Sequence, residues 1–204
     1  ALTAADNAMT FQTVVKTVAH RNGLCADFSA KSLEDKPGNG FHINISAQSD
    51  AGEELLPHII AGVLHFIPEM TAFLNPEEAS YSRFGASKAP AYISWSHENR
   101  SQLVRVPAAV YVQKRVELRS PDPTANPYLA FALLIYAGLY GIRNKLTPPP
   151  AADINFFKAD EETLAKFKKL PASLDEAIAA MKKSPFIHKY LPEQIVRLYS
   201  KKRI

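Results

Sequence analysis

The sequence has a single cysteine and no apolar run of membrane-spanning length. Cys25 is the only cysteine among 204 residues, so no disulfide can form within the chain, which agrees with a reducing cytoplasm. The longest apolar stretch, around 128–140, is broken by Gly138 and followed by Arg143. The first residues lack the basic start and continuous apolar block of a signal peptide. We therefore expect a cytoplasmic protein with no membrane partner.

Charge is also modest. Charged residues make up 22% of the chain, the net charge is +4 and the sequence pI is about 9.1, which indicates only a weak preference for anions. The arginines alternate along predicted strands without interleaved aromatic residues, so we expect no nucleic-acid partner. With 47% hydrophobic residues, the chain can bury the core of one domain, or of a large piece of one.

Apolar periodicity predicts three long helices, four strands and a tail of short helices. The predicted helices span 6–22, 53–73 and 126–145. The predicted strands span 41–46, 91–96, 101–106 and 115–120. Pro68 is expected to divide the second helix, because proline removes a backbone hydrogen bond. Helices and strands do not alternate regularly, so we expect an α+β fold with a curved antiparallel sheet backed by helices.

Alternation along two of these strands gathers polar side chains on one face. In the strand 41–46 the polar residues are His42, Asn44 and Ser46. In the strand 115–120 they are Arg115, Glu117 and Arg119. Residues two apart in a strand share a face and lie about 7 Å from each other. The pattern therefore places an imidazole and a carboxylate among guanidinium groups.

Three further arginines lie on neighbouring segments of the predicted fold. Arg83 is on a loop, and Arg100 and Arg105 are near the two ends of one strand. Clustered guanidinium groups suit an anion such as polyphosphate or a carboxylate, because their planar fork bonds oxyanions in pairs. His42 and Glu117 could share a divalent metal that neutralises phosphates. The alternative is a solvated strand with surface ion pairs around Glu117, and the pattern alone favours neither.

Four segments, in order, carry a family resemblance. They are Gly38-Asn39-Gly40-Phe41-His42, Asn99-Arg100-Ser101 with Arg105-Val106-Pro107, Arg115-Val116-Glu117-Leu118-Arg119, and Pro121-Asp122-Pro123-Thr124-Ala125-Asn126-Pro127-Tyr128. With these segments the chain resembles glutamine synthetase of the bacterial type, from its first helix to its tail. The last segment is the most specific, because it joins an active-site strand to the core helix.

The resemblance implies an ATP-dependent ligase that joins ammonia to the γ-carboxylate of glutamate through γ-glutamyl phosphate. It implies the glutamine synthetase catalytic-domain fold, with residues 1–204 as the C-terminal portion of that domain. The N-terminal domain and the first catalytic strands would then precede this sequence, and we expect the 204-residue piece to be inactive alone. Full-length relatives of this type form homo-oligomeric double rings.

The resemblance also implies roles for single residues. His42 and Glu117 resemble ligands of the Mg²⁺ or Mn²⁺ ion that holds the ATP phosphates. Gly38 resembles a backbone contact to glutamate. Arg83 and Arg119 resemble groups that fix the glutamate carboxylates and the transferring phosphoryl group.

The remaining implied roles concern ATP. Arg100, Arg105 and Arg115 resemble contacts to the ATP phosphates, and Ser46 lies where the nucleotide base or ribose is approached. Arg83, Arg100 and Arg119 are the residues that the resemblance assigns to catalysis.

Three positions depart from the family pattern. Lys88 stands where the family usually has a glutamate that helps deprotonate ammonium, and Glu98 is a candidate to replace that acid. Asn44 stands where many relatives have a second histidine. Phe157 lies where some relatives have an adenylylated tyrosine, so we expect no such regulation.

These departures keep two alternatives open. One is a γ-glutamyl-polyamine or other γ-glutamylamide ligase of the same superfamily, in which the amine differs. The other is a degenerate, non-catalytic paralogue that serves as a regulatory or assembly subunit.

Overall fold

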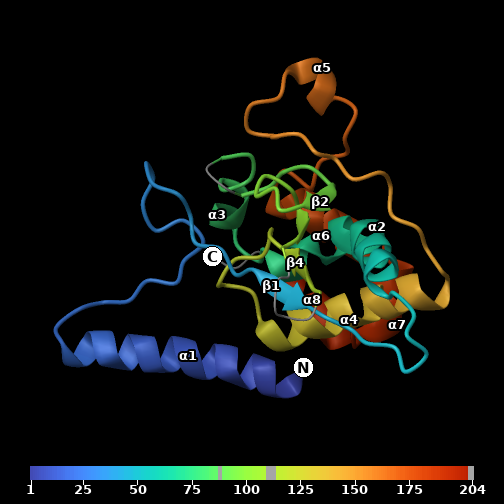
Figure 1. Cartoon of the computed structure of the whole chain (residues 1–204). Helices are drawn as coiled ribbons and strands as arrows, with labels where there is room; N and C mark the ends of the chain where they lie inside the picture. Colours follow the sequence, from blue (N-terminus) through green and yellow to red (C-terminus); the bar gives the residue numbers. More distant parts are fainter. Residues whose placement is uncertain (87–88, 109–113, 202–204) are drawn as a thin grey trace.

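The computed structural model describes residues 1–86, 89–108 and 114–201. Within these ranges the chain forms eight helices and four short strands (Figure 1). The helices are α1 (Leu2–Arg21), α2 (Leu56–Leu74), α3 (Glu78–Tyr81), α4 (Pro127–Arg143), α5 (Glu161–Leu164), α6 (Leu174–Lys182), α7 (Pro185–Tyr190) and α8 (Glu193–Tyr199). The strands are β1 (Ile43–Ile45), β2 (Trp95–His97), β3 (Val104–Val106) and β4 (Val116–Leu118). The predicted α+β class is confirmed.

The four strands form one mixed sheet in the order β1-β4-β3-β2. β4 pairs antiparallel with both β1 and β3, but β2 pairs parallel with β3, so the prediction of a fully antiparallel sheet is wrong at this edge. Each strand is only three residues long, so the short connection 98–103 is enough to return the chain to the start of the next strand. Parallel pairing usually requires a longer crossover.

Side chains pin this short connection to a distant part of the chain. Asn99 Nδ2 donates to the carbonyl oxygen of Ile154 at 2.7 Å, and Gln102 Nε2 donates to that of Ala152 at 2.7 Å. Gln102 is fully buried. The loop that carries Arg100 is therefore fastened to the segment 152–154.

The core is centred on α2, which packs along α4 and against α6. A Cβ atom at Gly62 would lie 2.1 Å from the Ala137 carbonyl oxygen, so the two helix backbones touch. α2 is long and apolar enough to cross a membrane by length and composition, but 72% of its most apolar window is buried in the fold. Pro68 lies inside α2 without ending it, so the predicted break is wrong. Packing on both sides outweighs the lost hydrogen bond.

α1 projects beyond the rest of the fold (Figure 1). Two hydrogen bonds tie it to the start of α4 and to the segment before that helix, from Tyr128 Oη to Asp6 Oδ1 at 2.6 Å and from Gln12 Nε2 to the Pro123 carbonyl oxygen at 3.0 Å. Its apolar residues recur at helical spacing, yet Phe11 is 62% exposed in this chain. A helix with an exposed apolar side is typical of a surface that other polypeptide covers.

The segment before α4 explains why the helix begins where it does. The Asn126 side chain accepts hydrogen bonds from the backbone N–H groups of Tyr128 and Leu129, and Pro127 occupies the first turn. An asparagine cap followed by proline is a strong helix start. This fixes the path of the chain from β4 into the core helix.

Candidate active site

Glu117 lies at the centre of a polar cluster on β4. It is paired in register with Asn44 on β1 and with Arg105 on β3. Residues directly opposite each other in antiparallel strands present their side chains on the same face. Three neighbouring strands therefore contribute to one group of polar side chains.

Both carboxylate oxygens of Glu117 are engaged. Oε1 lies 3.1 Å from His42 Nδ1. Oε2 accepts from Arg105 Nε at 2.5 Å and from Arg119 Nη1 at 3.3 Å. Arg119 Nη1 also lies 3.5 Å from His42 Nδ1, so His42, Arg105, Glu117 and Arg119 form one connected group, which we call the Glu117 cluster.

Glu117 and Arg119 are buried at the centre of the Glu117 cluster, whereas His42 is exposed and Arg105 is partly buried, so the cluster is not a fully solvated ladder of surface ion pairs. Glu117 is 6% exposed and Arg119 is 3% exposed. Burial alone raises the pKa of Glu117, but hydrogen bonds from His42 and Arg105 and the charges of Arg119 and Arg105 outweigh it and lower this pKa to about 2. Burial lowers the pKa of Arg119, and Glu117 opposes that effect. One carboxylate thus faces two guanidinium groups, which leaves positive charge for an anion.

The contact between His42 and Glu117 has the dimension of two ligands on one small cation. Two donor atoms at about 2.1 Å from an octahedral Mg²⁺ or Mn²⁺ ion lie about 3 Å apart when they are neighbours. His42 Nδ1 and Glu117 Oε1 are separated by 3.1 Å. Among the described residues no group of three or more His, Cys, Asp and Glu side chains is placed to hold a metal. The pair therefore has the spacing of two ligands of a metal site.

The other predicted ATP contacts lie at the edge of the Glu117 cluster. Arg115 Nε donates to Asn44 Oδ1 at 3.0 Å on the exposed side of the sheet. Arg100 is exposed in the connection 98–103, and its charge contributes to lowering the pKa of Arg119. Ser46 is exposed and lines a cavity of about 390 Å³ together with His42 and residues of α4.

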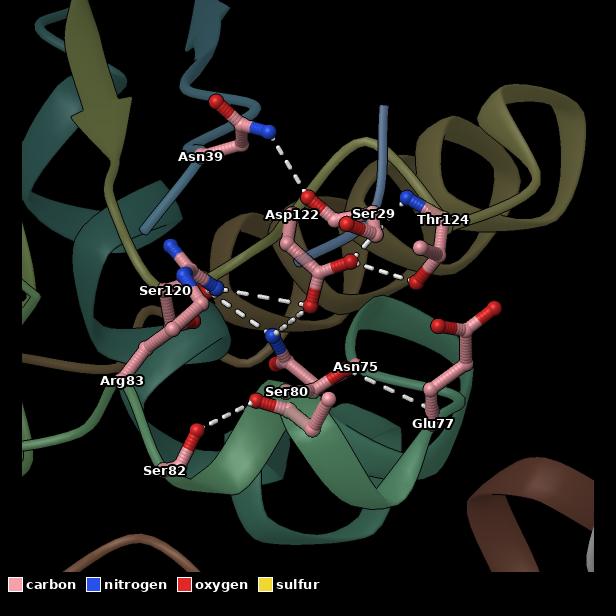
Figure 2. Close-up of polar contacts among 11 residues, drawn as sticks. Ser29, Asn39, Asn75, Glu77, Ser80, Ser82, Arg83, Ser120, Asp122 and Thr124 are labelled. Carbon is pink, nitrogen blue, oxygen red and sulfur yellow. Dashed lines mark hydrogen bonds and ion pairs between the residues drawn. The ribbon is translucent and has the colours of Figure 1, made fainter. Parts of the chain in front are cut away.

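Arg83 lies behind the loop 38–40 and is almost completely buried. Its Nη1 donates to the Ser120 carbonyl oxygen at 3.2 Å and to Asp122 Oδ2 at 3.4 Å (Figure 2). A Cβ atom at Gly40 would lie 3.7 Å from Arg83 Nη2 and 2.9 Å from His42 Nε2. The Arg83 guanidinium therefore lies close to Gly40, on the side of the loop that also faces His42.

Lack of space explains Gly38. A Cβ atom there would lie 2.5 Å from the Ala30 carbonyl oxygen and 2.7 Å from Arg83 Cγ. The backbone at Gly38 has no positive φ angle, in contrast to Gly85. This glycine allows the loop to lie directly on the aliphatic part of Arg83, a constraint that the sequence pattern did not reveal.

No sequence pattern predicted the partners of Arg83. Asp122 and Asn75 are fully buried, and Asn75 Nδ2 donates to Asp122 Oδ2 at 2.9 Å. Asp122 could have been suspected as a partner, because it is the acidic residue of the family-specific segment 121–128. Nothing in the sequence pointed to Asn75, which lies in none of the family-specific segments.

The positions that depart from the family pattern, other than Asn44, lie away from the Glu117 cluster or outside the described residues. Lys88 lies outside the described residues. Glu98 is exposed and lines a cavity of about 440 Å³ together with Trp95 and His97. None of the residues assigned to metal, ATP or glutamate is among the described residues that line this cavity. Phe157 is 38% exposed.

Comparison with known proteins points to one family. The family described as "Glutamine synthetase, catalytic domain" matches residues 1–203. The glutamine synthetase of Methanosarcina mazei is 41% identical over 213 residues, which cover 97% of this chain and 48% of that protein. The glutamine synthetase of Thermus thermophilus is 39% identical over 210 residues, which cover 96% of this chain and 47% of that protein.

Solved structures agree with this similarity. A structure described as "Apo GmaS without ligand" superposes with a TM-score of 0.84 at 30% identity, covering 98% of this chain and 48% of that one. A second, described as "GmaS/ADP complex-Conformation 1", has a TM-score of 0.83 and covers 96% of this chain and 48% of that one. The chain spans about half the length of the relatives that it matches.

Proposed function

The chain belongs to the glutamine synthetase family, and on that premise we propose that residues 1–204 form the C-terminal portion of the catalytic domain of a longer ATP-dependent ligase. This ligase joins ammonia to the γ-carboxylate of glutamate. The observation that carries the proposal is the Glu117 cluster, an enclosed carboxylate that contacts an imidazole and two guanidinium groups.

In this proposal Arg100, Arg105 and Arg115 hold the ATP phosphates. Arg105 and Arg119 flank Glu117, while Arg100 and Arg115 lie at the edge of the cluster where a long polyphosphate chain can extend. Ser46 is at the nucleoside end, beside a cavity of about 390 Å³. The solved structure described as an ADP complex supports nucleotide binding by a relative. Guanidinium groups suit this role because they bond phosphate oxygens in pairs.

His42 and Glu117 are the proposed ligands of a Mg²⁺ or Mn²⁺ ion. A 3.1 Å separation of their donor atoms supports that assignment. The bound ion supplies neutralisation of phosphate charge. For His42 to bind the ion through Nδ1, that nitrogen gives up the proton that it donates to Glu117, so the ring proton is on Nε2 when the ion is bound.

The proposed reaction has two steps. A γ-carboxylate oxygen of glutamate bonds to the terminal phosphorus of ATP as the bond to ADP breaks, which gives γ-glutamyl phosphate. Ammonia then attacks the acyl carbon, the nitrogen loses a proton and inorganic phosphate leaves. Arg83 and Arg119 position the carboxylate and the phosphoryl group, and Gly38 offers a backbone contact to glutamate. Phosphoryl transfer depends mainly on such positioning and charge neutralisation.

We also propose that the intact protein is a cytoplasmic homo-oligomer. The exposed apolar side chains of α1, such as Phe11, Val14 and Val18, support contact with further polypeptide.

The test uses a longer protein that contains residues 1–204. Glutamine formation from glutamate, ammonium and ATP is measured with Mg²⁺ and with Mn²⁺. We expect Glu117→Gln and Arg119→Lys each to reduce kcat/KM by about a hundredfold or more. The first removes the carboxylate charge, and the second keeps the positive charge but removes the planar fork that bonds oxyanions in pairs. Ser184→Ala, which removes a partly buried hydrogen bond to Glu69 and the buried side-chain cap of α7 elsewhere in the fold, is the matched control and should leave kcat/KM unchanged.

A panel of amines in the same assay separates the alternatives. If ADP is released faster with a polyamine or another amine than with ammonia, the protein is a γ-glutamylamide ligase and not a glutamine synthetase. A protein that binds neither manganese nor ATP would be a degenerate subunit, against which the complete Glu117 cluster counts. The 204-residue chain alone is expected to form no glutamine.

A further inference from the structure

Asp122 is a carboxylate with no exposed surface, and all of its described bonds are to groups of the fold (Figure 2). Oδ1 accepts from the Thr124 backbone N–H at 3.0 Å and from Thr124 Oγ1 at 2.5 Å. Oδ2 accepts from Asn75 Nδ2 at 2.9 Å and from Arg83 Nη1 at 3.4 Å. Four donors from three residues fix the plane of this carboxylate.

Asn75 fixes Asp122 to the core. It is the residue that ends α2, and its Nδ2 also donates to the Ser120 carbonyl oxygen at 2.9 Å. The backbone N–H of Asp122 donates to the Leu74 carbonyl oxygen at 3.3 Å. The end of the central helix thus holds the chain on both sides of Pro121, so Asp122 cannot turn without displacing that helix end.

Arg83 needs such a partner because it is buried. Its side chain is 3% exposed, and burial lowers the pKa of its guanidinium, an effect that the charge of Asp122 opposes. A buried guanidinium without a counter-charge is costly. Asp122 and Ser120 together hold Nη1 from behind.

The Nη2 end of the guanidinium lies against the loop at Gly40. Nη2 lies 3.7 Å from the point that a Gly40 Cβ atom would occupy, beside His42. Arg83 Nε is buried and has no hydrogen-bond partner among the described residues. Donors that the fold does not use, next to a glycine loop, suit an incoming carboxylate or phosphoryl oxygen.

We infer that Asp122 is the positioning residue of Arg83, oriented in turn by Asn75, and that it directs the Arg83 guanidinium toward an anionic ligand beside Gly40. The identity of that ligand as glutamate rests on the proposed function. The positioning itself does not, so the two are tested separately.

The first experiment uses the 204-residue chain and needs no activity. The Arg83 Nε–Hε signal in a ¹⁵N NMR spectrum is assigned by its loss in Arg83→Lys. We expect Asp122→Asn to speed hydrogen exchange of this group at least about tenfold, because a charged hydrogen bond that orders the guanidinium is lost. Asn75→Ala should have a smaller effect in the same direction, since the carboxylate charge remains.

Ser184→Ala is the control for destabilisation alone, and it should leave the Arg83 signal unchanged. If Asp122→Asn fails to fold, as judged by circular dichroism, Asn75→Ala carries the test. An Arg83 signal that is unchanged in the folded variant overturns the inference.

The second experiment measures kinetics in the longer protein. Asp122→Asn should raise the KM for glutamate about tenfold or more, with a much smaller change in the KM for ATP. In an Arg83→Lys background the same change should add little, because a residue that acts through Arg83 has nothing left to position. Additive effects overturn the inference. A changed NMR signal with an unchanged glutamate KM supports the positioning but removes Arg83 from glutamate binding in the proposed function.

Discussion

Glu117 and Asp122 are both buried acids beside arginines, but their carboxylates are held by different kinds of group. Glu117 contacts three side chains that carry or can carry positive charge, His42, Arg105 and Arg119. Asp122 contacts one arginine, and its other donors are a neutral amide, a hydroxyl and a backbone N–H group. The first group has more positive than negative charge, whereas the second is balanced.

This difference indicates which acid can exchange partners. An anion or a metal that enters the Glu117 cluster replaces contacts between side chains, and the surplus positive charge favours the anion. Replacing a partner of Asp122 leaves a buried polar group without a hydrogen bond, which is costly. The contrast predicts that Glu117 matters mainly for ligands and Asp122 mainly for stability and alignment.

Removing Asp122 should have the largest effect on stability. We expect Asp122→Ala to lower the free energy of unfolding of the 204-residue chain by about 3–5 kcal/mol, because it leaves the buried Arg83 unpaired. Urea denaturation followed by circular dichroism measures this change, with Ser184→Ala as a control that loses a buried hydrogen bond but no charge. A loss below about 1 kcal/mol would contradict the comparison.

Removing the charge of Glu117 should cost less and should respond to anions. We expect Glu117→Gln to lower the free energy of unfolding by about 2 kcal/mol, since hydrogen bonds to charged groups are lost. Added tripolyphosphate should raise the melting temperature of Glu117→Gln more than that of the unchanged chain, because the anion takes the place of the carboxylate. Asp122→Ala should gain no such extra stabilisation. Equal responses in the two variants would show that the clusters do not differ as described.

Filling the space above Arg83 should have a smaller effect. We expect Gly38→Ala to lower the free energy of unfolding by about 1–2 kcal/mol, because the new methyl group would meet a backbone oxygen at 2.5 Å. Gly138→Ala is the matched control, since the nearest atom there lies 3.4 Å away and alanine favours a helix. Thermal unfolding should show the first variant below, and the second at or above, the unchanged chain. The opposite order would remove the packing argument for Gly38.

Arg115 should contribute least to stability. It donates an exposed hydrogen bond to Asn44, so Arg115→Ala should change the free energy of unfolding by about 0.5 kcal/mol or less. In the longer protein the same variant should raise the KM for ATP about tenfold, the effect of one lost charge-assisted contact. A large loss of stability with an unchanged KM would make Arg115 a structural residue.

Period-two alternation predicted which polar side chains share a face within each strand, because side-chain direction in a strand depends only on position. The contact between His42 and Glu117 also requires β1 to pair with β4, which the alternation alone did not predict. The start of α4 was equally predictable from Asn126 and Pro127, since capping is local. The sequence pattern could not predict the parallel edge of the sheet, which depends on how the connection 98–103 folds back. It also could not predict that α2 continues through Pro68, because packing on both sides decides that outcome.

The partners of Arg83 were out of reach for a related reason. Asn75, Arg83 and Asp122 come from a helix end, a loop and the segment after β4, and no periodic pattern connects them. The need for glycine at position 38 likewise follows from the place of the Arg83 side chain and not from the turn itself. Contacts between distant irregular segments depend on the complete fold.

The loop 98–103 is anchored to residues 152–154, so the position of Arg100 depends on a segment that does not hold the other residues of the site. Arg100 follows directly after Asn99, whose amide is bonded to the backbone of Ile154. A substitution, insertion or bound molecule that displaces the segment 152–154 would therefore shift Arg100 while His42, Arg105 and Glu117 keep their places on the sheet. Under the proposed function, a change in the segment 152–154 would therefore alter nucleotide affinity through Arg100, without altering a residue proposed to touch the nucleotide.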